Sequence, residues 1–280
     1  MRSTTNGRLD CTGSGATLMT EKKQLNLTET PLVQRPRAIV VGASSGIGAA
    51  LARRLAAEGY ALALLGRRAG QLEELAAAIN RSAGQTVALA YPHDVTHYDE
   101  IPALFQQIVA ALGRLDLLAY VAGVMPPLAP NEYNFEKARQ TVEVNLLGAI
   151  AWLDQAAMLF QRQGSGQIVG VSSIAGDRGR VAHPPYHATK AGLSTYLESL
   201  RNRLAKHGVH VLTVKPGFVD TEMLAGASRT FWVIPPAQAA GDIWKAIRRR
   251  RQVVYTPARW RLIALTLIHI PSFIFRRLSF

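Results

Sequence analysis

Tyr186 and Lys190, four positions apart, form the pair in this 280-residue chain that is best suited to acid–base chemistry. Residues at i and i+4 share one face of a helix, so the ammonium group would lie beside the phenol. A free phenol titrates near pH ~10, and a neighbouring cation favours its ionised form and lowers that pKa. Ser173, thirteen residues before Tyr186, follows a short apolar run and supplies a hydroxyl for the same substrate oxygen. The three side chains predict proton transfer to or from an oxygen atom of a substrate.

A glycine-rich segment after the first apolar run could hold the phosphates of a nucleotide. Its sequence is Val41-Gly42-Ala43-Ser44-Ser45-Gly46-Ile47-Gly48, and a helical pattern begins within it. Glycines allow a tight turn and let phosphate oxygens approach the N–H groups at a helix N-terminus. The spacing differs from the commoner Gly-x-Gly-x-x-Gly fingerprint. The alternative is a strand-to-helix turn whose glycines serve packing alone.

The second apolar run ends in Leu65-Gly66-Arg67-Arg68, and the next acidic residue is Glu73. A carboxylate at this position would bind the 2′-hydroxyl of the adenosine ribose, whereas an arginine would pair with a 2′-phosphate. The sequence therefore favours NADPH or NADP+ over NADH or NAD+. Two solvated arginines at the end of a strand are the alternative.

These groups are separated by short apolar runs that alternate with helical patterns. Strands are predicted at Ala38–Val41, Tyr60–Leu65, Thr86–Tyr91, Leu115–Val121, Gln167–Val171, Val209–Lys215 and Gln252–Tyr255. Helices are predicted at Gly46–Glu58, Gln71–Asn80, Ile101–Leu112, Asn134–Gln161, Tyr186–Lys206 and Pro236–Arg250. This alternation is typical of a parallel sheet with crossover helices. We therefore predict one doubly wound α/β domain over residues 37–256.

Residues 37 to about 255 resemble the short-chain dehydrogenase/reductase family. The matching motifs are the Gly42–Gly48 loop, His93-Asp94-Val95, Ala122-Gly123, Asn145, Ser172-Ser173, Tyr186-x-x-x-Lys190 and Pro216-Gly217-Phe218-Val219-Asp220-Thr221. Their order and spacing are specific, although each motif alone is weak. The resemblance implies a Rossmann-like fold with about seven strands in the order 3-2-1-4-5-6-7. It also implies homodimers or homotetramers.

The resemblance also assigns roles to single residues. Asn145 joins Ser173, Tyr186 and Lys190 in the catalytic set by extending a proton relay, and Lys190 also binds the nicotinamide ribose. A buried Asn145 that holds a helix to the sheet is the alternative, and Asp94, expected at the adenine, could instead cap a turn. The expected cofactor site comprises Gly42, Ser44, Ser45, Gly46, Ile47, Gly48, Arg67, Arg68, Asp94, Val95, Ala122, Gly123, Tyr186, Lys190, Pro216, Gly217, Val219 and Thr221.

The chain departs from the family pattern at two places. Val41 replaces the usual threonine before the loop, which removes one side-chain hydrogen bond. Tyr120-Val121 replaces the asparagine pair of Asn-Asn-Ala-Gly, so we expect different packing there. Neither change removes a reacting group.

Composition limits the cellular setting. Apolar residues make up 48% of the chain and charged residues 18%, as in folded soluble proteins. Cys11 is the single cysteine, which excludes an intrachain disulfide and favours a reducing, cytoplasmic compartment. No His, Asp and Glu cluster has metal-ligand spacing, so we predict no metal. Residues 1–36 resemble a flexible leader without the apolar stretch of a signal peptide, and Met19 is an alternative start.

The C-terminal segment 257–280 is predicted to be a basic, apolar helical extension. Nine of the basic residues lie between Lys245 and Phe280, where there are no acidic ones, and the whole chain has a formal net charge of +13. The tail thus carries +9 of the net +13, and the absence of a recognised nucleic-acid reading motif argues against nucleic-acid binding. Trp260–Ile270 is too short to span a bilayer. Attachment to a membrane surface, a lid over a lipophilic substrate, and contact with another subunit all remain open.

The favoured function is NADP(H)-dependent interconversion of an alcohol and a ketone or aldehyde, with a lipophilic substrate as one option. The alternative is a non-catalytic dinucleotide sensor or a membrane-surface interaction protein. Segments 177–185 and 222–235 are expected to line the substrate site. Their arginines Arg178, Arg180 and Arg229 are consistent with an anionic substrate or with solvated loops.

Overall fold

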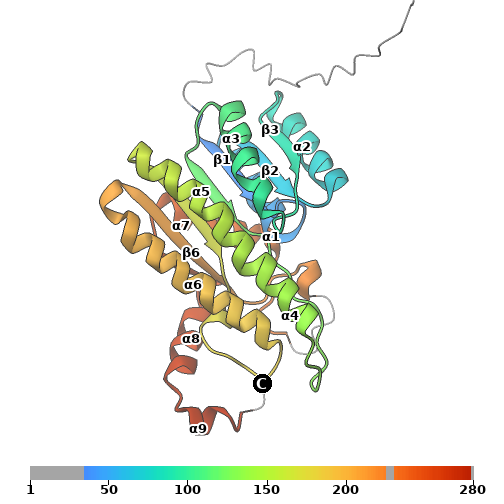
Figure 1. Ribbon diagram of the computed structural model, residues 1–280, viewed down its shortest axis with the longest axis vertical. Helices are drawn as coiled ribbons and strands as arrows, with labels where there is room; N and C mark the ends of the chain where they lie inside the picture. Colours follow the sequence, from blue (N-terminus) through green and yellow to red (C-terminus); the bar gives the residue numbers. More distant parts are fainter. Residues whose placement is uncertain (1–34, 225–229, 279–280) are drawn as a thin grey trace, which may run out of the picture.

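A parallel sheet forms the centre of the computed structural model, which describes residues 35–224 and 230–278 (Figure 1). Its seven strands are β1 (Arg37–Val41), β2 (Ala61–Gly66), β3 (Ala88–Pro92), β4 (Leu117–Tyr120), β5 (Gly166–Val171), β6 (Val209–Pro216) and β7 (Val253–Thr256). Their order, β3-β2-β1-β4-β5-β6-β7, is the predicted one. β1, β2 and β4 are buried throughout, as expected for strands covered on both faces. The predicted leader falls almost entirely outside the described residues.

Helices cover both faces of the sheet. α1 (Gly46–Ala57), α2 (Ala69–Ala83) and α7 (Pro236–Arg248) bury Leu51, Leu72 and Ile243 in one hydrophobic core. α3 (Ile101–Leu112), α5 (Gly148–Gln163) and α6 (Pro184–Leu204) contribute to a second core, to which α5 supplies Trp152 and α6 Leu193. This is a doubly wound, Rossmann-like α/β domain, and the predicted fold class is confirmed. The element ends differ from those predicted by up to three residues.

The long helix predicted at Asn134–Gln161 is interrupted. α4 (Phe135–Val142) leads into a π-helical turn at Glu143–Leu147 before α5 begins. Tyr120 contacts this turn: its buried hydroxyl donates a 2.6 Å hydrogen bond to the carbonyl oxygen of Val144. Gly148 accommodates it, since a Cβ there would lie 3.0 Å from the Tyr120 hydroxyl. The tyrosine that replaces a family asparagine thus anchors the turn that carries Asn145.

Phe135–Gln163 is also, in the described part of the chain, the helix that is long and apolar enough to cross a membrane. Trp152, Leu153 and Phe160 of this helix are fully buried in the domain. Core packing on the sheet therefore accounts for its apolar character.

The C-terminal extension is helical, as predicted, with α8 (Trp260–His269) followed by the short α9 (Ser272–Phe275). Figure 1 shows both in red at one end of the molecule, away from the middle of the sheet. Trp260 is 2% exposed and forms a small core with Ile174 and Ala264. Its indole lies so close to Gly217 that a Cβ there would be 1.9 Å from Trp260 Nε1. The extension is thereby packed on the loop after β6.

Candidate active site

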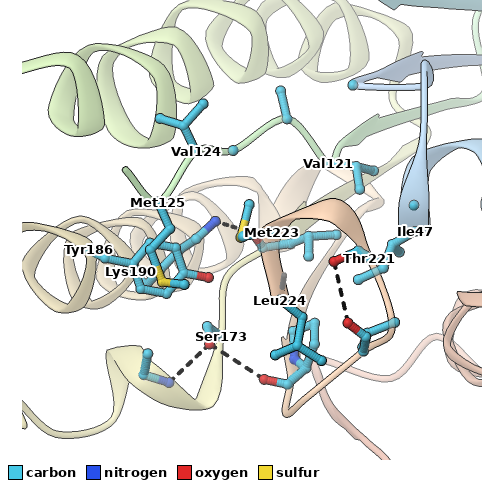
Figure 2. A pocket seen from close by; sticks show the side chains of 18 of the residues that line it. Ile47, Val121, Val124, Met125, Ser173, Tyr186, Lys190, Thr221, Met223 and Leu224 are labelled. Atoms are coloured by element: carbon cyan, nitrogen blue, oxygen red, sulfur yellow. Dashed lines mark hydrogen bonds between the residues drawn. The ribbon is translucent and has the colours of Figure 1, made fainter. Parts of the chain in front are cut away.

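A cleft of about 1430 Å³ collects nearly all of the predicted site residues. It is lined by Ser173, Tyr186 and Lys190, and by Gly42, Ser44, Ser45, Gly46, Ile47, Gly48, Arg67, Arg68, Asp94, Val95, Ala122, Gly123, Pro216, Gly217, Val219 and Thr221. Figure 2 shows Ser173, Tyr186 and Lys190 on one side of this pocket, with Ile47 and Thr221 on the other. Asn145 alone among the predicted residues does not line the cleft.

Two adjacent elements position the acid–base residues. Ser173 caps a one-turn 3₁₀ helix at Ile174–Gly176. Its Oγ accepts a hydrogen bond from the Ala175 N–H at 3.1 Å and donates one to the carbonyl of Pro216 at 3.4 Å. Tyr186 and Lys190 lie one turn apart on α6, as the spacing predicts. Lys190 Nζ is 5.6 Å from the centre of the Tyr186 ring.

The electrostatics of the pair differ from expectation. Burial raises the pKa of Tyr186 above its ordinary value, and the opposing contributions come from the Ser173 hydroxyl and the positive charge of Arg180. The expected lowering of this pKa by Lys190 is therefore wrong. Lys190 instead donates to the carbonyl of Val171 at 3.0 Å, and burial lowers its own pKa to about 8. A lysine with that pKa exchanges protons readily near neutral pH.

Asn145 is fully buried in the π-helical turn and braces a loop. Its Oδ1 accepts from the N–H of Val124 at 2.7 Å, and its Nδ2 donates to the Val124 carbonyl at 2.9 Å. A Cβ on Gly123 would lie 3.3 Å from Asn145 Oδ1 and 3.4 Å from Lys190 Nζ, so both groups face that glycine. These bonds tie the π-helical turn to the loop after β4 rather than to a strand of the sheet, and the relay role stays a prediction.

The glycine-rich loop is shaped by contacts that admit no side chain. Gly42 has a φ of +89°, and a Cβ there would lie 2.4 Å from the Ala122 nitrogen. A Cβ on Gly48 would lie 2.0 Å from the Gly42 carbonyl oxygen. Ser45 precedes α1 without capping it by a side-chain hydrogen bond, so the first N–H groups of α1 keep their capacity for an anion. The loop fits the phosphates of a dinucleotide.

The arginines at the end of β2 adjoin this loop. Arg68 donates to Ser45 Oγ at 2.6 Å and to Ser44 Oγ at 3.2 Å, and pairs with Glu222 at 2.8 Å. Arg67 lies 3.9 Å from the carboxylate of Asp94. The cluster places guanidinium groups at the rim of the nucleotide loop.

Asp94 also fulfils its alternative role as a turn cap. Its Oδ1 accepts from the N–H and the hydroxyl of Thr96 at 3.0 and 2.9 Å. Burial opposes ionisation of Asp94, but the hydrogen bonds from Thr96 and the charge of Arg67 outweigh it and lower its pKa.

Comparison with known proteins agrees with this geometry. The sequence model of the family described as short chain dehydrogenase matches residues 36–231. The chain belongs to the short-chain dehydrogenase/reductase family. An uncharacterized oxidoreductase of Mycobacterium tuberculosis is 31% identical over 78% of this chain and 86% of its own length. A cis-4-hydroxycyclohexanecarboxylate dehydrogenase of Sinomonas cyclohexanicum is 39% identical over 68% of this chain and 75% of its own.

Solved structures of short-chain dehydrogenases and reductases show the same fold. An actinorhodin polyketide ketoreductase with NADPH is 29% identical, covers 76% of this chain and 90% of its own, and has a TM-score of 0.69. A short-chain dehydrogenase from Sphingobium yanoikuyae in complex with NADPH is 25% identical, with a TM-score of 0.74. The match covers 85% of the present chain and 97% of the Sphingobium protein. The present protein is thus an oxidoreductase of this family, which acts on CH–OH and C=O groups with a nicotinamide dinucleotide.

The C-terminal extension supplies part of the cleft wall in this short-chain dehydrogenase. Trp260, Ile263 and Leu267 of α8 line the cleft. Arg178, from the loop before α6, donates to the carbonyl oxygens of Leu267, Ile268 and Ile270 and lies 4.0 Å over the ring of Phe275. α8 therefore forms part of the cleft wall, while the lid, membrane-surface and subunit-contact options stay predictions.

The two segments expected to line the substrate site contribute further residues to the cleft. Arg180, Glu222, Met223 and Leu224 line the cleft beside Tyr186 or Thr221. Arg180 and Glu222 fall in the segments expected to line the substrate site, but no spacing distinguishes them from solvated loop residues. Arg229 lies outside the described residues.

Proposed function

We propose that the protein reduces a ketone or aldehyde to an alcohol at the expense of NADPH, and catalyses the reverse reaction with NADP+. The observation that carries this proposal is the guanidinium cluster at the rim of the glycine-rich loop, where Arg68 contacts Ser44 and Ser45. Arginine pairs with phosphate through charge-assisted, often bidentate hydrogen bonds. The side chains of Glu73 and Glu74, on the following helix, do not line the cleft. The two NADPH complexes among the similar structures support the same cofactor.

The bound nicotinamide would supply or accept the hydride. Ser173 Oγ hydrogen-bonds the substrate oxygen, and the Tyr186 hydroxyl donates its proton to that oxygen during reduction. A phenol whose pKa is raised by burial is fully protonated at neutral pH, which suits the reductive direction. The two hydroxyls are close enough that Ser173 affects the pKa of Tyr186. They would bind one oxygen atom from adjacent positions.

Lys190 and Asn145 complete the proposed set. Lys190 Nζ donates one of its three hydrogens to Val171 O. The other two are available to the cofactor ribose and for proton exchange with Tyr186. Its pKa of about 8 allows it to return a proton to the phenolate after each turnover. Asn145 positions the Val124 loop next to Lys190, and its amide oxygen has capacity for one more donor, such as a relay water.

The cofactor proposal is tested by titrating NADPH and NADH against the wild type, Arg67→Ala, Arg68→Ala and the control Arg81→Ala, with nicotinamide fluorescence as the signal. Losing one arginine–phosphate contact should weaken NADPH binding about 10- to 100-fold and change NADH binding little. Arg81 is exposed on α2 and should match the wild type. Equal affinity of the wild type for both cofactors would contradict the proposal, and binding of neither would contradict the enzymatic function.

We also propose that the substrate has a largely apolar carbon skeleton, called its apolar body below. Ile174, Phe231, Trp260, Ile263 and Leu267 line the cleft. Burial of apolar substrate surface against such a wall stabilises the complex by roughly 25 cal/mol per Å². The name of the Sinomonas cyclohexanicum relative describes an alcohol on a carbocycle, which is a substrate of this kind.

Docking of the extension on an anionic membrane surface is a second proposal. The described tail exposes Leu262 (70%), Leu265 (48%), Phe273 (61%) and Ile274 (43%). Exposed arginines flank them at 259, 261, 276 and 277, and no acidic residue follows Asp242. Apolar side chains with flanking cations and no anions suit the headgroup region of anionic lipids.

Flotation with vesicles tests this docking. The wild type should bind phosphatidylserine-containing vesicles, release at high salt, and bind phosphatidylcholine vesicles weakly. The double variant Leu262→Ser, Phe273→Ser should lose most of the binding. Equal flotation of the wild type and this variant would contradict membrane docking, and preferential binding to duplex DNA would favour nucleic acid instead.

A further inference from the structure

Two arginines of the loop between the 3₁₀ turn at Ser173 and α6 are used in different ways. Arg178 has its guanidinium engaged by three carbonyl oxygens and by the ring of Phe275. Arg180 forms no hydrogen bond and no ion pair with any residue in 35–224 or 230–278. It nevertheless lines the cleft, near Tyr186. The structure thus leaves one guanidinium without a partner next to the proposed proton donor.

The surroundings of Arg180 provide no counter-charge. Burial lowers the pKa of its guanidinium, and Tyr186 is the group that opposes this effect. The acids that line the cleft are already paired, Asp94 with Arg67 and Glu222 with Arg68. Asp177, on the same loop, is held by an ion pair with Lys215 and a hydrogen bond from the hydroxyl of Tyr255.

A partly buried cation with no anion beside it is unfavourable unless a bound ligand supplies the negative charge. Desolvation of an unpaired charge costs free energy that a bound counter-ion recovers. A guanidinium presents parallel N–H donors that match the two oxygens of a carboxylate. The apolar wall of α8 belongs to the same cleft. The complementary molecule therefore combines an apolar body, a carbonyl or hydroxyl group, and an anionic end.

We propose that Arg180 is a specificity-determining residue that binds a carboxylate of the substrate, so that the substrate is an apolar keto acid and the product the corresponding hydroxy acid. This proposal rests on the proposed reductase function and names its substrate class. A carboxylate is favoured over a phosphate because one guanidinium neutralises one negative charge. Arg178, Lys215 and Arg68 already have partners in the described part of the chain.

Binding to a dead-end complex tests the proposal without turnover. Calorimetry on the NADP+-loaded protein would measure the affinity of cyclic and straight-chain keto acids of about four to ten carbon atoms, of their methyl esters, and of keto phosphates of similar length. With NADP+ no hydride is available for a ketone, so the measured value is a binding constant. The proteins compared are the wild type, Arg180→Gln, Arg180→Lys and the exposed control Arg81→Gln. NADP+ binding in the same titration verifies that each variant is folded.

The wild type should bind at least one keto acid about 10- to 100-fold more tightly than its methyl ester, the range expected for a charge-assisted contact. That ratio should fall to about one in Arg180→Gln, fall less in Arg180→Lys, and persist in Arg81→Gln. Equal binding of acids and esters, a preference that survives Arg180→Gln, absence of binding across the series, or tighter binding of the phosphates would each overturn the proposal. Failure of the reductase function is seen separately, as absence of NADPH oxidation with every acid and ester despite cofactor binding.

Discussion

Replacement of Arg178 by alanine should release the C-terminal extension from the cleft. One guanidinium nitrogen of Arg178 donates to Leu267 O at 2.6 Å, Ile268 O at 3.1 Å and Ile270 O at 2.5 Å, at the end of α8. Hydrogen bonds to a charged group contribute about 1.5–3 kcal/mol each, but one nitrogen has two hydrogens to share among three acceptors. With partial exposure and an added cation–π contact to Phe275, the set amounts to about 3 kcal/mol. This corresponds to a factor of about 100 in the docking equilibrium.

Hydrogen exchange measured by mass spectrometry on peptides covering 260–270 provides the assay. A free helix of this length is only marginally stable in water, so undocking of α8 exposes its amides. Their exchange should accelerate about 100-fold in Arg178→Ala and about 10-fold in Arg178→Lys, which keeps the charge but not the fork. Peptides from β4 serve as the internal reference. If exchange in α8 stays within about threefold of the wild type, Arg178 is not the anchor and the reasoning fails.

Four further predictions follow from single contacts. Tyr186→Phe removes the proposed proton donor and keeps the ring, so kcat for carbonyl reduction should fall about 10²- to 10⁴-fold in steady-state assays. Tyr120→Phe leaves the Val144 carbonyl without its buried partner and should lower the free energy of unfolding by about 1–3 kcal/mol in urea titrations. Gly217→Ala places a Cβ 1.9 Å from Trp260 Nε1, so α8 should exchange faster, as in Arg178→Ala. Burial lowers the pKa of Lys190 from 10.5 to about 8, so the unfolded chain binds this proton more tightly than the folded protein does. The free-energy cost of burying the charged ammonium group is therefore lost, and the folded state becomes more stable, as the pH rises from about 8 to 10.5. The melting temperature of the wild type relative to Lys190→Met should therefore increase between those two pH values, and a constant difference would contradict it.

The sheet and most of the site could be predicted from sequence because each depends on local patterns. Seven short apolar runs separated by helical patterns define the strands, and the family motifs place the same residues at their carboxyl ends. The π-helical turn was not predicted, because nothing in the sequence near Asn145 indicates it. It coincides with a hydrogen bond from Tyr120, which is 24 residues away from Val144.

On the substrate side, the sequence predicts two lining segments but not the roles of their individual side chains. Arg178 and Arg180 are two positions apart in one loop, and their residue types are identical, yet only the fold brings Leu267 and Ile270 to the first of them. The pKa of Tyr186 was misjudged for a similar reason. The spacing of Tyr186 and Lys190 indicates proximity, but not that the Lys190 ammonium group is engaged by Val171 O while burial dominates the phenol.

The position of α8 in the cleft wall has a consequence for biosynthesis. The nucleotide loop and the acid–base residues precede α8 in the chain, so Trp260, Ile263 and Leu267 are translated after them. Because chains fold from the N-terminus during synthesis, the cofactor half can form before the substrate wall exists. A chain that ends after β7 would retain the nucleotide loop and lose that wall.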